Sequence, residues 1–205
     1  MSRAGGEIDL GRGFIDPVLG AQRCFRAILS AMSEPGTVHD LGERIEAPRG
    51  VTAAAALVLL ALADQETPVW LTPALRTVAA PFIRFHCGAA IVEAPADARF
   101  ALLDGVAIEP GLMAFDAGDD RYPDRSATLI IQCAALHGGQ PVSLSGPGIN
   151  CRRQVAPAGL HAAFWREAAA NADRYPLGID LILAAGASLL AIPRSTRIAS
   201  AGEAP

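Results

Sequence analysis

The segment YPLGIDLILAAGASLLAIPRSTRI, residues 175–198, contains two short apolar runs separated by a glycine turn. The first run covers 179–183 apart from Asp180, the turn is 186–188, and the second run, 189–192, stops at Pro193. This pattern predicts two strands joined by a tight turn. Because apolar residues fall on both faces of the pleat, we expect at least one strand to be covered on both sides, as in a layered α/β sheet.

Polar groups follow the second run directly, in the order Arg194, Ser195, Thr196, Arg197. Guanidinium and hydroxyl groups suit anion binding, and open α/β sheets bind ligands where strands end. A second candidate is the Gly-Pro-Gly turn formed by residues 146–148. There Gly146 and Gly148 would let the backbone approach a ligand closely, with two arginines just beyond at 152 and 153. The alternatives are a solvent-exposed strand exit at 194–197 and a turn without ligand at 146–148.

The composition indicates a globular protein without a membrane span. The chain has 205 residues, 51% of them hydrophobic, which suits one domain with a substantial core. Its longest apolar run, Ala53–Ala63, has 11 residues, whereas a span needs roughly 18 or more. The N-terminal residues lack the apolar core of a signal peptide, so we expect a cytoplasmic protein. Its four cysteines have no C-x-x-C spacing and are expected to be reduced and mostly buried.

Several function classes are excluded by the net charge, by the residues that the chain lacks and by the spacing of its motifs. A net charge of -4 and no basic stripe argue against a nucleic-acid binder. All 17 basic residues are arginine, so the chain lacks both the lysine that binds pyridoxal phosphate and the Walker A lysine. Ser145 lacks the preceding glycine of a hydrolase nucleophile elbow. The aspartates of 104–126 do not match a calcium loop. We therefore expect no cofactor, no metal and no catalytic residue.

The first predicted helix begins after Asp16 as cap and Pro17 in the first turn. Its predicted buried face carries apolar residues spaced by three and four, namely Phe25, Ile28, Leu29 and Met32. A second, fully buried helix is predicted over 51–63. A third is predicted over 72–80, ended by Pro81 and followed by an extended segment at 84–87. On such an extended segment, His86 and Cys87 would point to opposite faces and form no common site.

Further strands are predicted at 37–41, 69–71, 91–92 and 99–103. Residues 128–134 and 140–144, separated by a His-Gly-Gly turn, give the clearest hairpin signal in the chain. The last predicted helix is 159–172, with Leu160, Phe164 and Ala168 on one face. We expect a single α/β domain over 14–198, with disordered ends at 1–13 and 199–205.

Seven phrases, in order along residues 14–198, resemble one known family. They are FRAILSAMSEPG (25–36), LADQETPVWL (62–71), RFH (84–86), TLIIQ (128–132), LSGPGI (144–149), YPLGIDLIL (175–183) and LLAIPRST (189–196). From them the chain is identified as a member of the PhnH family, which belongs to the bacterial carbon-phosphorus lyase system. No single phrase is specific, but their order along the chain is.

The resemblance implies a bacterial protein of phosphonate catabolism. Its fold would be a three-layer α/β sandwich, a mixed sheet between helices, similar to a reduced pyridoxal-phosphate-dependent transferase. The chain would form a homodimer and join subunits G, I and J in an assembly that couples a phosphonate to the ribose of ATP and displaces adenine. The resemblance implies no catalytic residues in this chain, and the missing lysine fits a fold kept without its chemistry.

Two functions follow from the sequence. The first is an accessory, non-catalytic subunit of the phosphonate-processing assembly, whose interfaces would account for the high apolar content. The second is a stand-alone binding protein or enzyme for an anionic phosphorylated ligand, a phosphonate or a nucleotide, held by 194–197 and 146–148. Co-elution with subunits G, I and J tests the first function, and binding of these ligands tests the second.

Overall fold

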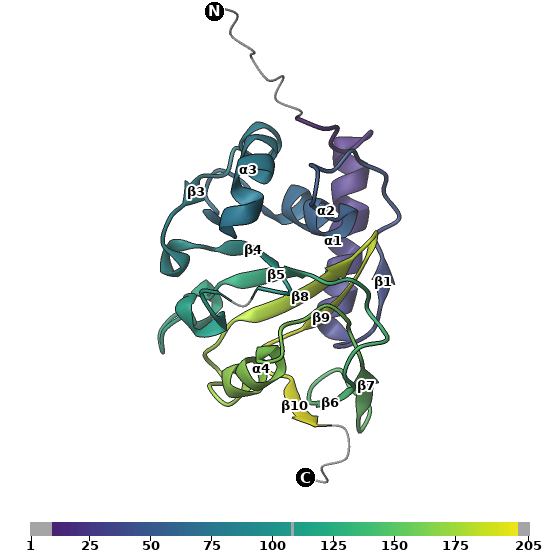
Figure 1. The fold of residues 1–205 in the computed structure, drawn as a ribbon, viewed down its shortest axis with the longest axis vertical. Helices are drawn as coiled ribbons and strands as arrows, with labels where there is room; N and C mark the ends of the chain where they lie inside the picture. The colour runs from purple at the N-terminus through teal and green to yellow at the C-terminus, as the bar shows by residue number, and fades with distance from the viewer. Residues whose placement is uncertain (1–9, 108, 201–205) are drawn as a thin grey trace, which may run out of the picture.

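The computed structural model describes residues 10–107 and 109–200, and its framework is a mixed central sheet (Figure 1). In the described residues this sheet has the strand order β1-β9-β8-β5-β4-β2-β3. Neighbours from β3 to β8 in this order run parallel, whereas β9 is antiparallel to both β8 and β1. The strands of the central sheet are β1 (His39–Asp40), β2 (Val69–Leu71), β3 (Ile91–Val92), β4 (Phe100–Asp104), β5 (Thr128–Gln132), β8 (Asp180–Ala185) and β9 (Ser188–Ile192).

Helices and a second, small sheet cover the two faces of the central sheet. One face carries α1 (Pro17–Ser33), α2 (Ala53–Leu62) and α3 (Pro73–Cys87), at the top of Figure 1. The other carries α4 (Phe164–Ala172) and the small sheet, whose strands are β6 (Val142–Ser145), β7 (Arg153–Val155) and β10 (Arg197–Ser200). Single-turn 3₁₀ helices lie at Pro95–Asp97, Leu112–Ala114 and Pro123–Arg125.

The buried strands explain why both faces need a cover. Along β8, Leu181 and Leu183 pack into the core shared with α4 and the small sheet, whereas Ile182 packs into the core shared with α1 to α3. Side chains alternate across a strand, so an apolar run without polar interruptions buries both faces. The predicted hairpin of β8 and β9 and the α/β class are confirmed. The outer layer beside α4 contains strands, however, and is not purely helical as predicted.

The predicted pairing of residues 128–134 with 140–144 is wrong. β5 lies between β4 and β8, parallel to both, while β6 pairs with β7 and β10 in the small sheet. Instead of turning back, the chain leaves the central sheet after Gln132 and returns to it only at Asp180. Alternating apolar residues identify a strand, but they do not identify its neighbour.

Pro81 does not end the third helix, and the predicted extended segment at 84–87 is helical. α3 continues through Pro81 to Cys87 and stops at Gly88, which adopts a left-handed conformation. An internal proline costs about 3 kcal/mol in a helix. Burial of Phe82 and Ile83, both 1% exposed, contributes roughly 1.5–3 kcal/mol each and outweighs that cost.

The predicted buried face of α1 is also partly wrong. Phe25 and Leu29 are 49% and 57% exposed, and the helix instead buries small residues together with Ile28. These small residues are Gly20, Cys24 and Ala31. A side chain at Gly20 would collide with Phe14, because an added Cβ would lie 2.7 Å from its ring. α1 therefore packs closely through its small residues and Ile28, whereas Phe25 and Leu29 face outward.

Other boundaries differ by a few residues. α4 begins at Phe164 rather than at 159, and the strand predicted over 37–41 is reduced to β1. Arg12 forms an antiparallel bridge with Glu46, and β10 runs to Ser200, so regular structure extends past both predicted boundaries, 14 and 198. The predicted disordered residues 1–9 and 201–205 lie outside the described residues. Within the described ranges, no helix has the length and apolarity needed to cross a membrane.

The cysteines are expected to differ sharply in reactivity. Burial raises the pKa of Cys24 and Cys87 to about 11 each, and that of Cys133 to about 12. Cys151 is exposed. Since the thiolate is the reactive form, a raised pKa leaves little of it near pH 8. We expect an aromatic disulfide reagent to label Cys151 alone in the native protein and all four thiols after unfolding, as counted by mass spectrometry. Native labelling of Cys133 would contradict this.

Candidate functional site

The predicted anion site lies at the opposite edge of the sheet from the one that the general rule favours. Open α/β sheets bind ligands at the carboxyl ends of their parallel strands. β9 is antiparallel to β8, so its end at Ile192 pairs with Leu181, near the amino end of β8. Residues 194–197 therefore lie at the amino edge of the parallel strands, and the expectation based on that rule is wrong here.

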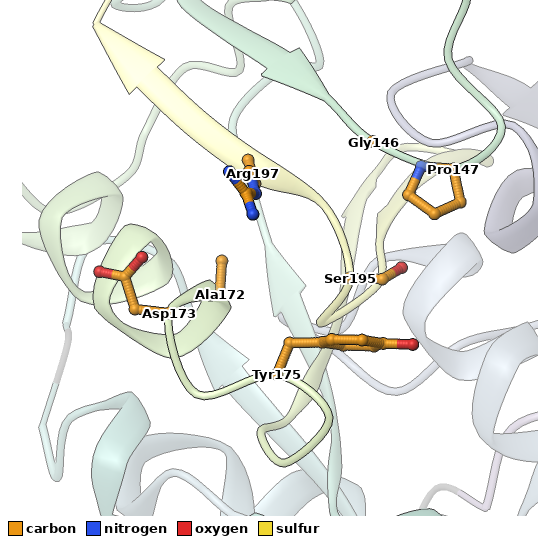
Figure 2. A pocket seen from close by; sticks show the side chains of 7 residues that line it. All are labelled: Gly146, Pro147, Ala172, Asp173, Tyr175, Ser195 and Arg197. Atoms are coloured by element: carbon orange, nitrogen blue, oxygen red, sulfur yellow. The ribbon is translucent and has the colours of Figure 1, made fainter. Parts of the chain in front are cut away.

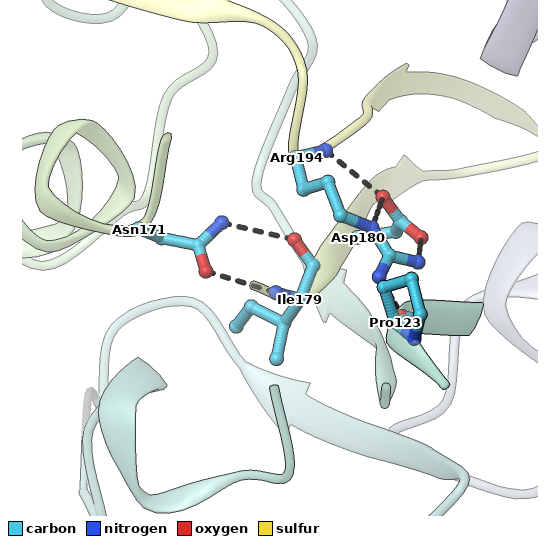
Figure 3. Close-up of polar contacts among 5 residues, drawn as sticks. All are labelled: Pro123, Asn171, Ile179, Asp180 and Arg194. Carbon is cyan, nitrogen blue, oxygen red and sulfur yellow. Dashed lines mark hydrogen bonds and ion pairs between the residues drawn. The ribbon is translucent and has the colours of Figure 1, made fainter. Parts of the chain in front are cut away.

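Arg194 is committed to the interior (Figure 3). Its Nη2 lies 2.6 Å from Oδ2 of Asp180, and its backbone N–H and Nε both donate to Oδ1, over 2.9 and 3.2 Å. Its Nη1 donates to the carbonyl oxygen of Pro123. The side chains of Arg194 and Asp180 are only 16% and 13% exposed. Arg194 thus connects the segment after β9 to the start of β8, and its guanidinium is used in contacts within the chain rather than being free to bind a ligand.

A pocket of about 440 Å³ does bring part of the predicted site together (Figure 2). Gly146 follows β6, and Ser195 and Arg197 come from the segment between β9 and β10 and from the start of β10. They meet because β10 pairs with β6, with Arg197 opposite Ser145. The remaining lining residues are Pro147, Ala172, Asp173 and Tyr175. The end of α4 and the loop after it therefore contribute a carboxylate and an aromatic ring that sequence reasoning did not select.

The other predicted site residues do not line this pocket. Thr196 is 1% exposed, and its Oγ1 has no hydrogen-bond partner in the described residues. Gly148 packs against the end of α1, where an added Cβ would lie 2.1 Å from the carbonyl oxygen of Ser33. Its glycine is needed for this close approach and for its positive φ of 79°. Of the six predicted residues, Gly146, Ser195 and Arg197 remain in the candidate site.

Asn171 holds the α4 side of the pocket in place (Figure 3). Its Oδ1 accepts a hydrogen bond from the backbone N–H of Ile179, and its Nδ2 donates to the carbonyl oxygen of the same residue, both over 2.9 Å. Asn171 is 2% exposed. These two hydrogen bonds connect the end of α4 to the residue before β8 and so hold the loop that carries Asp173 and Tyr175. The positions of both residues therefore depend on one buried amide.

At the carboxyl ends of β5 and β8, where a ligand would be expected, polar groups bond to the chain itself. The Oε1 atom of Gln132 accepts a hydrogen bond from the backbone N–H of Thr52 over 2.6 Å, and its Nε2 donates to the carbonyl oxygen of Gly50 over 3.0 Å. The N–H of Ala54 donates to the carbonyl oxygen of Gly186. Helix N-termini bind anions through free N–H groups. At the start of α2 these donors are bonded to the chain's own oxygen atoms.

The pocket combines charged and hydroxyl groups that can bind a ligand. Arg197 supplies a cation, Asp173 an anion, and Ser195 a hydroxyl. His86, predicted to form no common site with Cys87, lies outside the pocket and contacts the carbonyl oxygen of Leu10. Where the structure describes the chain, no cluster of three or more histidine, cysteine or acidic side chains is arranged to hold a metal.

A family model described as "Bacterial phosphonate metabolism protein (PhnH)" matches residues 12–199. The chain belongs to the PhnH family. The matched range includes the central sheet, the small sheet up to Ala199 and all the residues that line the pocket. The resemblance seen in the sequence is therefore confirmed over most of the chain.

Two curated relatives extend the match. The chain is 41% identical over 186 residues to "Alpha-D-ribose 1-methylphosphonate 5-triphosphate synthase subunit PhnH" of Rhizobium meliloti (strain 1021), covering 90% of this chain and 93% of the relative. It is 29% identical over 178 residues to "Putative C-P lyase subunit protein HtxG" of Stutzerimonas stutzeri. That alignment covers 86% of this chain and 85% of the relative.

Proposed function

We propose that the chain is an accessory, non-catalytic subunit of a carbon-phosphorus lyase assembly, acting in the formation of ribose 1-alkylphosphonate 5-triphosphate from ATP and a phosphonate. The observation that carries this proposal is the family match over residues 12–199, together with the synthase name of the relative from Rhizobium meliloti. The absence of lysine from the sequence supports a role without covalent amine chemistry. The assembly would be cytoplasmic.

We also propose that the single domain resembles a reduced pyridoxal-phosphate-dependent transferase fold. The mixed sheet between two covering layers supports this resemblance. The absence of lysine fits a scaffold kept for binding other chains.

The test is co-expression with subunits G, I and J, followed by size-exclusion chromatography and an assay of the assembly. We expect this chain to elute with the other subunits and the assembly without it to lose ribose phosphonate formation. The purified chain alone should release no adenine from ATP in the presence of a phosphonate. Separate elution under all conditions would overturn the subunit role.

The outer face of α1 is the surface that we propose for homodimer formation. Its exposed residues, starting just before the helix, are spaced alternately by three and four: Ile15, Val18, Gln22, Phe25 and Leu29. This is the spacing by which helices pack along a common seam. A second copy matches it, because an isologous contact buries the same face on both chains.

An antiparallel arrangement of the two α1 helices fits the polar residues of this face. With the two-fold axis near Gln22, the middle of this row of residues, the Gln22 amides of the two copies approach each other and can exchange hydrogen bonds. Arg26 would then lie over the N-terminal half of the partner helix, toward the carboxylate of Asp16. The opposed helix dipoles add a favourable contribution.

We expect the double variant Phe25→Glu with Leu29→Glu to be monomeric by light scattering at concentrations where the original protein is dimeric. Its thermal unfolding should change little relative to the original monomer, because both side chains face outward in the chain. Phe85→Glu is the matched control, since this aromatic is 66% exposed on α3, outside the proposed face. A double variant that stays dimeric but no longer elutes with the other subunits would assign the face to one of them instead.

The pocket supports a second function, the binding of an anionic phosphorylated ligand. Arg197, Ser195 and Gly146 converge there, and no carboxylate lies within 4.0 Å of Arg197 among the described ion pairs. A phosphonate or nucleotide phosphate would accept from the guanidinium and the hydroxyl. Calorimetry with methylphosphonate and ATP tests this function. If no heat of binding is measured at millimolar ligand concentration, the proposed ligand binding is wrong.

A further inference from the structure

The pocket that holds Arg197 also holds a carboxylate, which an anion site would avoid. Asp173 lines it from the end of α4, and Arg197 lines it from the start of β10 (Figure 2). In the described residues they form no ion pair within 4.0 Å. Each charge is therefore available to a ligand, and the pocket as a whole is close to electrically neutral.

The Asp173 side of the pocket suits a cation for two reasons, its carboxylate and its place at the end of a helix. Its carboxylate belongs to the C-cap residue of α4, where the helix dipole adds a partial negative charge. Tyr175, two residues further along the chain and 63% exposed, lines the same pocket, but its ring extends away from the Asp173 carboxylate. In Figure 2 this ring reaches from the loop after α4 toward Ser195.

The opposite side of the pocket suits an oxyanion. Arg197 offers guanidinium donors and Ser195 a hydroxyl donor. Gly146 lets the end of β6 approach the backbone of Ser195 closely, since a Cβ added there would lie 2.9 Å from the carbonyl oxygen of Ser195 and its φ of 135° disfavours other residues. The donors and the acceptor are thus separated across one cavity of about 440 Å³, which is room for a small molecule.

We propose that this pocket binds a small zwitterion, with its oxyanion on Arg197 and Ser195 and its ammonium group on Asp173. The proposal rests on the pocket being the ligand site of the second function, and it names the ligand class as an aminoalkylphosphonate. A nucleotide triphosphate is disfavoured, because its several negative charges would meet one guanidinium and one carboxylate.

The test is calorimetry on the full chain with aminoethylphosphonate, ethylphosphonate and ethylamine as probes. We expect aminoethylphosphonate to bind at least about tenfold more tightly than ethylphosphonate, since one added charge contact of this kind is worth about that factor. Ethylamine alone should bind most weakly. Taurine and beta-alanine, which keep the amine and change the oxyanion, show whether phosphonate itself is preferred.

Two variants separate the contributions of the charges. Asp173→Asn should remove the preference for aminoethylphosphonate over ethylphosphonate while leaving ethylphosphonate binding no weaker. Arg197→Gln should weaken both ligands together. Asp97→Asn, in a 3₁₀ turn outside the pocket, is the control. Thermal unfolding of each variant verifies that the fold is kept.

The outcomes distinguish this inference from the functions it builds on. Equal affinity for ethylphosphonate and aminoethylphosphonate would overturn the zwitterion but leave an anion pocket in place. Absence of binding by every probe would overturn the pocket as a ligand site and the zwitterion with it. Neither result would affect the subunit role, which is read from co-elution with the other subunits.

Discussion

Replacement of Asp180 by alanine is expected to lower the free energy of unfolding by about 3–5 kcal/mol, the cost of breaking a buried ion pair. Asp180 accepts three hydrogen bonds from Arg194, through its backbone N–H, its Nε and its Nη2. Without this carboxylate, a guanidinium that is 16% exposed remains in the interior with the Pro123 carbonyl as its remaining partner in the described contacts. The start of β8 and the exit of β9 would lose their connection.

Urea unfolding of the variant measures this loss. Glu93→Gln is the matched control, because Glu93 pairs with Arg76 at the surface and is 86% exposed; its unfolding midpoint should stay close to that of the original protein. The double variant Asp180→Leu with Arg194→Met should recover much of the lost stability, since removing both charges leaves none unpaired. Equal midpoints for Asp180→Ala and Glu93→Gln would show that the pair is not buried in solution.

The second large effect is expected for Asn171→Leu, at about 2–5 kcal/mol, because two buried backbone groups lose their partners at once. Both the N–H and the carbonyl oxygen of Ile179 bond to the Asn171 amide over 2.9 Å. Leucine is similar in size but bonds to neither. The carboxamide also contacts Gly178, where an added Cβ would lie 2.8 Å from Oδ1, so the loop has little room to adjust.

Asn171→Leu should also affect the pocket, because Asp173 and Tyr175 lie in the loop that this amide closes. We expect weaker aminoethylphosphonate binding in addition to the lower unfolding midpoint. Asn171→Asp, which keeps the shape and the acceptor but loses the donor, should be destabilised as well. Asn150→Leu, at an exposed asparagine, is the control. Unchanged stability of Asn171→Leu would mean that water or another group satisfies Ile179.

Subunit contact and ligand binding use different parts of the molecule. The outer face of α1 lies over one side of the central sheet, whereas the pocket lies on the other side, between α4 and the small sheet (Figure 1). Variants of Phe25 and Leu29 should therefore leave ligand binding unchanged, and variants of Asp173 and Arg197 should leave assembly unchanged. The two proposed roles are separable by experiment.

Local patterns predicted the elements well where one signal dominated. The cap at Asp16 and the proline at position 17 placed the start of α1, and Asp16 does accept from the N–H groups of Val18 and Leu19. The hairpin of β8 and β9 followed from two apolar runs and a glycine turn. These signals act over a few residues, so they are complete in the sequence.

Errors arose where distant contacts outweighed local preference. Pro81 is a helix breaker by itself, yet burial of Phe82 and Ile83 keeps α3 continuous. The helical spacing of apolar residues predicts that Phe25 is buried. Close packing of α1 through Cys24 and Ala31 leaves it facing outward instead. In both cases the packing partners lie elsewhere in the chain.

The sequence by itself determined the α/β class, the family, the absence of lysine chemistry and three residues of the pocket. Only the tertiary structure decided that β5 lies between β4 and β8, that Arg194 is committed to Asp180, and that Asp173 and Tyr175 line the same pocket as Arg197. The physical reason is that strand neighbours and ion pairs are selected by burial and charge between segments far apart in the chain. A pattern within one segment carries no information about which partner it will meet.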